Sequence, residues 1–354
     1  MKKRHILWVA ILSTMGFVDA ALADGPRNYL YIVGSTTVAP FTEAAAGKIE
    51  KSAKLKRPLL ESDGTNGGFR MFCEGTGMDY PDIVNAFRPI RKREFDICQA
   101  NGVGDIVEGK IGYDALVIVV NKKAKPMMGL TLKDLYLALA KQVPDPACNE
   151  SCDKLVTNPY KTWKQIDPAL PDVKIEVFGP PSNSGFTEVF AEAVLEAGCN
   201  KYPLLAAKKA NNGKEYKRAC DNIREDGVYV EETGEMIADR LDYSNPDTVG
   251  IINYSRLKEN ASHLQALKLE GVAPDYESIA TQSYPLARPL FFYVKKAHVT
   301  RIPGFQAFLA EFTSEKALGP KGYLISKGLV AMSAQELKTT ATDLKTLKPM
   351  PSPN

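Results

Sequence analysis

The chain has 354 residues, of which 44% are hydrophobic and 25% are charged, and its formal net charge is +3. This is the composition of an ordinary globular protein, and the length suits two medium domains or one large one. A net charge this close to zero produces no overall electrostatic attraction for nucleic acid or a membrane surface. Any bound anion must therefore be held by a local group of residues.

Residues 1–23 have the pattern of a secretory signal peptide. Three basic residues precede the apolar run "ILWVAILSTMGFV", and "ALA" directly before Asp24 fits a cleavage site. The apolar run is too short for a membrane-spanning helix, which needs about 20 residues. We therefore expect a mature chain that is exported to the periplasm.

Strand-like and helix-like segments alternate along the exported part, which predicts an α/β fold with mostly parallel sheets. In the first part, strands are expected at residues 28–33, 57–62, 82–87 and 113–120. Helices are expected at residues 40–50 and from about residue 69. The segment 122–130 has the character of a crossing between two lobes.

The second part continues the alternation. A helix is expected at residues 131–140, a strand at 173–179, a helix through about residue 197, and strands at 249–254 and 289–294. The polar, Lys-rich stretch 199–226 predicts a surface insertion, and the end of the chain is expected to be helical.

All six cysteines lie in the exported part: Cys73, Cys98, Cys148, Cys152, Cys199 and Cys220. An even number of cysteines in an oxidising compartment favours disulfides. The sequence leaves several pairings open, and pairing neighbours gives 73–98, 148–152 and 199–220. Only His263 and His298 remain after export, so few histidines are available for a metal site or a Ser-His-Asp site. We therefore expect no metal and no cofactor.

Three strands end in small polar residues and glycine directly before a helix: "GSTT" at 34–37, "SDGTNGG" at 62–68 and "SNSG" at 182–185. Ligands of open α/β sheets sit beyond the carboxyl ends of strands, and helix starts bind anions through their free N–H groups. Each motif alone is more often a helix cap or a tight turn. The three together predict an anion site.

At these residues the sequence resembles the phosphate-binding component of bacterial phosphate ABC transporters. The resemblance spans nearly the whole exported chain and rests on the order of the blocks "GSTTVAPF", "SDGTNGGF", "DIVNAFRPI", "FGPPSNSG" and "SYPLARPLFFYV". It implies a two-lobed periplasmic binding protein fold of type II with the ligand cleft between the lobes. Lobe one would comprise residues 24–119 and 288–354, and lobe two residues 120–287 with the stapled insertion near 199–220.

The resemblance also implies a function without a reaction. The chain would be a monomer that captures inorganic phosphate and delivers it to an ABC transporter permease in the inner membrane. Carried over by position, the ligand contacts would come from Ser35, Thr36, Thr37, Thr65 and Arg88 in lobe one and from Ser184, Gly185 and Thr187 in lobe two. Neutral donors in a dry cleft satisfy a phosphate dianion, and an arginine can clamp two of its oxygens. The alternative for Arg88 is a solvated surface arginine.

Two positions depart from the family pattern. Phe87 stands where relatives usually offer a small polar or acidic residue, and Phe186 stands where threonine is typical. Phenylalanine cannot accept a hydrogen bond from hydrogen phosphate, so we expect weaker rejection of sulfate or arsenate than in a typical relative, unless Asp63 supplies an acceptor. Each phenylalanine is either a core residue or a wall of a changed pocket.

Two other classes of function were weighed. The first is an enzyme such as a serine hydrolase or a phosphatase. The sequence has no G-x-S-x-G motif, no metal-ligand cluster and only two histidines in the exported part, far apart, so we expect that the protein is not an enzyme. The same fold used for another oxyanion or an organic anion, or for sensing or adhesion, is favoured by positions 87, 186 and 187 and stays open.

Overall fold

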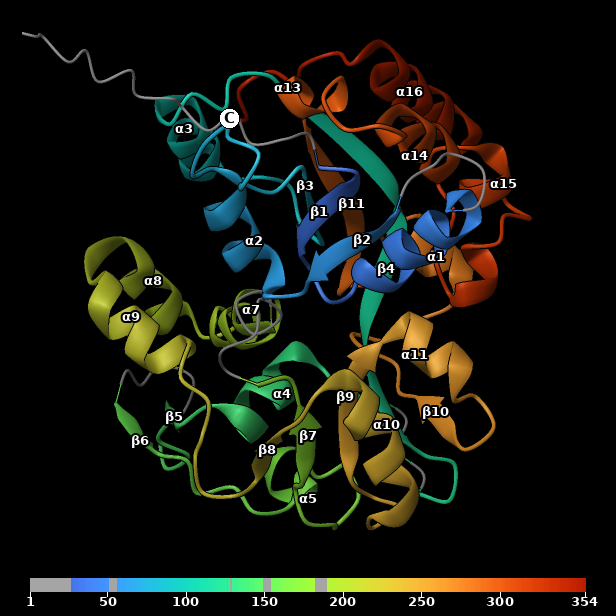
Figure 1. Cartoon of the computed structure of the whole chain (residues 1–354). Coiled ribbons are helices and arrows are strands. Elements are labelled where there is room, and N and C mark those ends of the chain that lie inside the picture. Colours follow the sequence, from blue (N-terminus) through green and yellow to red (C-terminus); the bar gives the residue numbers. More distant parts are fainter. Residues whose placement is uncertain (1–26, 51–55, 126, 128, 149–153, 182–189) are drawn as a thin grey trace, which may run out of the picture.

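The computed structural model describes residues 27–50, 56–125, 127, 129–148, 154–181 and 190–354. The predicted signal segment, residues 1–23, lies outside them. Figure 1 shows two α/β lobes that lie one above the other and are joined by extended strands.

A nine-stranded sheet runs through both lobes in the order β2-β1-β3-β11-β4-β9-β7-β8, with β10 paired to β4. Its strands are β1 (Tyr29–Gly34), β2 (Lys56–Glu61), β3 (Ile83–Ala86), β4 (Ile106–Asn121), β7 (Val177–Gly179), β8 (Tyr229–Glu231), β9 (Val249–Asn253), β10 (Leu264–Ala266) and β11 (Ala287–Lys295). A separate hairpin consists of β5 (Gln142–Pro144) and β6 (Leu155–Thr157).

The long strand β4 carries the chain from one lobe to the other. It pairs with β11 as far as Ala115 and with β9 from Leu116 onward. Both of these pairings are antiparallel, whereas β1 with β2 and β3, and β7 with β8 and β9, are parallel. The prediction of mostly parallel sheets is therefore only partly right, because β3 with β11, β10 with β4, and β5 with β6 are also antiparallel.

Helices cover both lobes. The upper lobe in Figure 1 carries α1 (Ala39–Ile49), α2 (Gly64–Phe72), α3 (Lys92–Ala100), α13 (Lys296–Val299), α14 (Phe305–Phe312), α15 (Glu315–Leu318), η2 (Ile325–Lys327) and α16 (Ala334–Thr346). The lower lobe carries α4 (Leu132–Leu139), α5 (Trp163–Ile166), η1 (Ala191–Glu196), α7 (Ala197–Cys199), α8 (Pro203–Asn211), α9 (Gly213–Cys220), α10 (Gly234–Tyr243), α11 (Tyr254–Glu259) and α12 (Tyr276–Ala280).

Several element boundaries differ from the prediction, and packing explains two of them. Helix α2 begins at Gly64 rather than near residue 69. A Cβ at Gly68 would lie 2.5 Å from the Cα of Gly34 on β1, so glycine lets the helix touch the strand, and this contact offsets its poor helix propensity. Strand β4 begins at Ile106 rather than 113, because its first half finds a partner in the distant β11.

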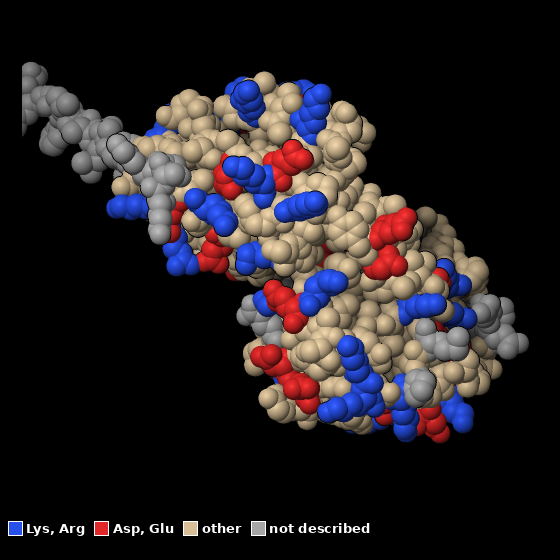
Figure 2. All heavy atoms as spheres, turned by 90° about the vertical axis from the view of Figure 1, so that its right-hand side faces the viewer, with Lys and Arg blue, Asp and Glu red and all other residues tan. Residues whose placement is uncertain are grey.

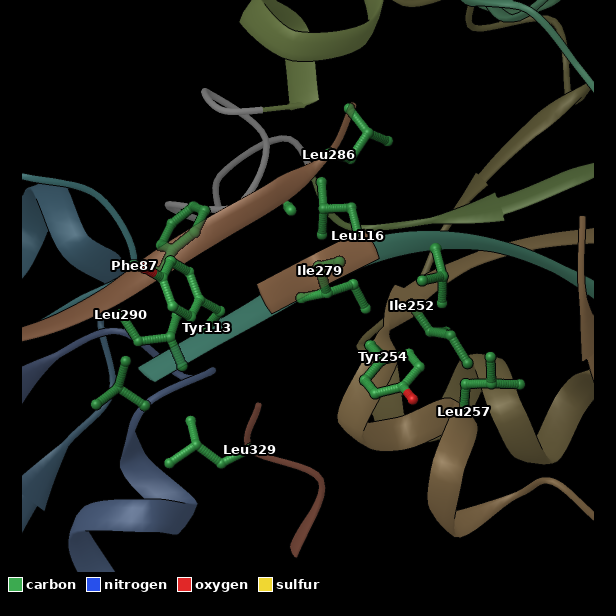
Figure 3. Packing of buried hydrophobic residues seen from close by; sticks show 14 of the residues in the cluster. Phe87, Tyr113, Leu116, Ile252, Tyr254, Leu257, Ile279, Leu286, Leu290 and Leu329 are labelled. Carbon is green, nitrogen blue, oxygen red and sulfur yellow. The ribbon is translucent and has the colours of Figure 1, made fainter. Parts of the chain in front are cut away.

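The hydrophobic core is continuous through the crossing. In Figure 3, Phe87 and Tyr113 lie towards the left and Ile252 and Leu257 towards the right, with Leu116 of β4 between them. Phe87 is 5% exposed and belongs to this core cluster, so the interpretation of Phe87 as a core residue is confirmed.

Two of the three predicted disulfides are confirmed. Cys73 pairs with Cys98, and Cys199 pairs with Cys220. The second bridge ties the helical hairpin α8–α9 to the end of α7, and a small apolar core lies beneath it. The third pair includes Cys152, which lies outside the described residues, so this pairing stays a prediction.

The surface mixes both signs of charge. On the face in Figure 2, basic and acidic side chains are interspersed over both lobes, as expected for a nearly neutral chain. Within the described part of the chain, every helix is too short or too polar to cross a membrane.

Candidate functional site

A cavity of about 720 Å³ lies between the lobes. Lobe one lines it with the β1–α1 loop, the start of α1, strand β2 and Lys327. Lobe two lines it with the end of β7, the start of α10, strand β9 and the first residues of α11. Because both lobes contribute walls, a ligand here would contact each of them.

The β1–α1 loop brings two hydroxyls to this cavity. Thr36 and Thr37 both line it, whereas Ser35 is 2% exposed and donates its backbone N–H to the Asn85 carbonyl at 2.9 Å. The cap residue of α1 is Val38, which makes no side-chain capping hydrogen bond. The threonine hydroxyls are therefore not used to cap the helix.

A hydrogen-bond network joins this loop to lobe two. The amide Nδ2 of Asn253, the last residue of β9, donates to Thr37 Oγ1 and to Asp114 Oδ2, each at 3.2 Å. Ser255 donates to the same carboxylate with its hydroxyl at 3.0 Å and its backbone N–H at 3.3 Å. The Asp114 carboxylate lies at the crossing in β4 and is 2% exposed.

Burial sets the acidity of Asp114. Loss of hydration disfavours its charged form and raises its pKa from 3.8 to about 6, although its hydrogen bonds from Ala115, Asn253 and Ser255 act in the opposite direction. The donors to this carboxylate are neutral, so Asp114 keeps its charge at neutral pH through hydrogen bonds alone.

The second predicted loop, at the start of α2, meets the segment that follows β3. Thr65, in the first turn of α2, is fully buried, and its Oγ1 accepts a hydrogen bond from the Phe87 N–H at 3.4 Å. The start of α2 and the segment after β3 are therefore in contact, but neither Thr65 nor Phe87 is among the described residues that line the cavity.

Arg88 is committed to an acidic partner. Its guanidinium makes a bidentate contact with Glu94, at 2.9 and 2.7 Å, and also donates to Asn66 and to the Pro89 carbonyl. Glu94 in turn accepts from the Arg91 N–H and thereby fixes the start of α3. The arginine side chain is only 9% exposed, so it is neither solvated nor part of the cavity lining.

Comparison with known proteins places the chain in a family. A model of the PBP superfamily domain matches residues 20–316. The chain belongs to the PBP superfamily. It is 30% identical to Protein SphX of Synechococcus elongatus over 294 residues, which cover 80% of this chain and 74% of that relative.

Other members of the PBP superfamily are also similar. A phosphate-binding protein PstS of Staphylococcus epidermidis is 27% identical over 348 residues, which cover 95% of this chain and 89% of the relative. An ABC-type phosphate transport receptor from Vibrio cholerae superposes with a TM-score of 0.57 at 20% identity, covering 86% of this chain and 99% of the receptor. The predicted two-lobed α/β fold of this superfamily is confirmed.

The remaining predicted site residues of this PBP-superfamily chain are only partly placed. Ser184, Gly185, Phe186 and Thr187 lie outside the described residues. Asp63 is solvent-exposed and is not among the described residues that line the cavity. No group of three or more His, Cys, Asp or Glu that could hold a metal occurs in the part of the chain that the structure describes.

Asn253, Ser255 and Asp114 were not predicted from the sequence. Asn253 is the last residue of the late strand and Ser255 lies two positions later, so a polar residue at a strand end was the available signal. That strand lacks the glycine-rich turn of the other three motifs. Asp114 sits inside an apolar strand, where only the tertiary structure reveals its partners.

Proposed function

We propose that this chain is a periplasmic solute-binding protein that captures inorganic phosphate between its lobes and delivers it to an ABC permease in the inner membrane. It does so without catalysis. The observation that carries the proposal is the interlobe cavity, where Thr36 and Thr37 of lobe one face Asn253 and Ser255 of lobe two. Full-length relatives named as phosphate-binding proteins support the choice of phosphate.

Two residues of the predicted ligand set, Thr36 and Thr37, line the cavity and support this proposal. The start of α1 lies beside Thr36 and Thr37, and the helix dipole favours an anion there. Thr65 at the start of α2 and the "SNSG" segment of lobe two complete the proposed set. In this proposal Arg88 holds the segment after β3 in place, since Glu94 occupies its guanidinium.

A second candidate keeps the fold and changes the ligand. The cavity of about 720 Å³ is within the usual range for a drug-sized ligand, and charged side chains of both signs line it: Glu43, Arg57, Arg256, Glu259 and Lys327. This size and lining favour an organic anion that is larger than a single oxyanion group.

Calorimetry on the mature chain distinguishes the two candidates. Phosphate, sulfate, arsenate and a panel of organic phosphates and carboxylates would be titrated under one buffer condition. Tight binding of inorganic phosphate supports the transport proposal. Binding of an organic anion with no measurable phosphate binding would replace it with the second candidate, and release of product from a phosphoester would contradict the absence of catalysis.

A further inference from the structure

Asn253 occupies a fixed orientation in the cleft. A primary amide has two N–H donors on its nitrogen and an acceptor oxygen. Here Nδ2 donates to both Thr37 Oγ1 and Asp114 Oδ2, so both donors are used. The acceptor Oδ1 receives no hydrogen bond from any described residue, and Asn253 lines the cavity.

Asp114 is the residue that sets this orientation. Its ionised carboxylate only accepts hydrogen bonds. Rotating the Asn253 amide by half a turn would place Oδ1 against a carboxylate oxygen, which leaves two acceptors in contact. The Ala115 N–H and the two donors of Ser255 hold the carboxylate itself in place.

The same bond sets the polarity of Thr37. Its Oγ1 accepts from Asn253, and no other hydrogen bond of this hydroxyl occurs among the described residues. The hydroxyl proton is thus available to a ligand. Thr37 and Asn253 therefore present an adjacent donor and acceptor to the cavity, each neutral.

We propose that Asn253 is the proton acceptor of the cleft and that Asp114 is its positioning residue. Together they select an oxyanion that retains a proton, such as monohydrogen phosphate, over fully ionised sulfate. The inference rests on the proposed function. A phosphate hydroxyl donates to Oδ1, whereas every sulfate oxygen would face that acceptor without a proton between them. Arsenate keeps a proton as phosphate does, so this acceptor does not reject it.

The size of the selection follows from the neutral acceptor. Monohydrogen phosphate gains a hydrogen bond to an uncharged amide oxygen, whereas sulfate leaves two acceptors in contact. This difference supports a preference for phosphate over sulfate of about 10- to 100-fold. A neutral oxygen also avoids direct repulsion of the dianion. The Asp114 charge is fully hydrogen-bonded and is not part of the described cavity lining.

The test compares phosphate and sulfate affinities at pH 8 by calorimetry for wild type, Asn253→Ala and Asp114→Asn. Asn253→Ala should weaken phosphate binding by about tenfold or more and change sulfate binding little. Asp114→Asn should lower the phosphate-to-sulfate ratio by a smaller factor, because Asn253 remains but is free to turn. Asn245→Ala, an exposed asparagine remote from the cavity, should leave the ratio unchanged.

The ratio separates a site effect from a structural one, since a merely destabilised protein loses both anions equally. Equal losses for phosphate and sulfate in Asn253→Ala, or a wild-type chain that binds both equally, would overturn this inference alone. If Asn253→Ala does not fold, an unchanged ratio in Asp114→Asn would overturn it. A wild-type chain that binds neither anion would overturn the proposed function as well.

Discussion

Asp82 and Asp114 are both almost fully buried, but different kinds of partner hold them. Asp82 lies at the amino end of β3, away from the cleft, and contacts Arg27 at 2.8 Å and His298 at 2.6 Å. Asp114 lies beside the cleft and has only neutral donors. An arginine, a histidine and the Tyr31 N–H thus hold the carboxylate that is remote from the cavity, and only amide and hydroxyl groups hold the one next to it.

The surroundings of Asp82 reinforce this contrast. Lys295 is 1% exposed, donates to the Gly75 carbonyl, and lies over the rings of Phe72 and Tyr80. Burial lowers the pKa of Lys295 to about 8, while attraction to Asp82 raises it and repulsion from Arg27 lowers it further. Removing Asp82 would therefore take its negative charge away from Arg27 and Lys295, whereas removing Asp114 would release neutral groups.

The largest expected effect is on stability at the remote carboxylate. Asp82→Ala should lower the free energy of unfolding by about 3–5 kcal/mol, because it breaks a buried ion pair and leaves Arg27 without its carboxylate. Urea denaturation measures this. Asp105→Ala is the matched control, since Asp105 pairs with Lys296 at the surface and should cost less than about 1 kcal/mol. A similar small loss in both variants would contradict the contrast.

The next effect concerns the pH dependence of stability at Asp114. Because its folded pKa is raised to about 6 from 3.8, its protonated form is favoured in the folded state, and stability is lost as pH rises from about 4 through 6. Asp114→Asn lacks this titration. Relative to wild type, its free energy of unfolding should therefore rise by up to about 3 kcal/mol between pH 4 and pH 7. Parallel pH curves for the two proteins would show that the carboxylate does not titrate this way.

Removing a hydroxyl in the cleft should weaken phosphate binding without changing the stability of the fold. Thr36→Val removes the hydroxyl donor and keeps a side chain of similar shape. We expect the free energy of phosphate binding to weaken by about 1.5–3 kcal/mol. Because Val38 is the cap of α1, the free energy of unfolding should barely move. The reverse result, a loss of about 1 kcal/mol in stability with unchanged affinity, would make Thr36 a capping residue.

The smallest expected change is in overall shape. Ligand donors come from both lobes, so binding favours a closed arrangement that brings them to one anion. Small-angle scattering should show a slightly smaller radius of gyration with saturating phosphate. An unchanged radius with bound phosphate would indicate a rigid cleft, or a site confined to one lobe. The lobe boundaries at 119/120 and 287/288 remain predictions, and the hinge of such a closure would show where they lie.

Local patterns in the sequence were sufficient for most of the fold. Strands β1, β3 and β9 and helices α1 and α4 lie where alternation and periodicity predict them, because their apolar residues face a nearby core. Strand β2 also lies where it is predicted, although its Leu59 is exposed. The cysteine spacing led to the bridges 73–98 and 199–220 for a similar reason, since short loops bring neighbouring cysteines together. The resemblance added the two-lobed arrangement and the expected ligand loops.

The partners of single polar residues were decided by the tertiary structure. Arg88 follows a strand like a ligand residue, yet Glu94, six positions later, takes its guanidinium once α3 forms. Asn253 is 216 positions from Thr37, and its two donors find their acceptors only after β9 pairs with β4. A sequence specifies which residues can donate or accept, but hydrogen bonds depend on distances of about 3 Å that only the folded chain sets.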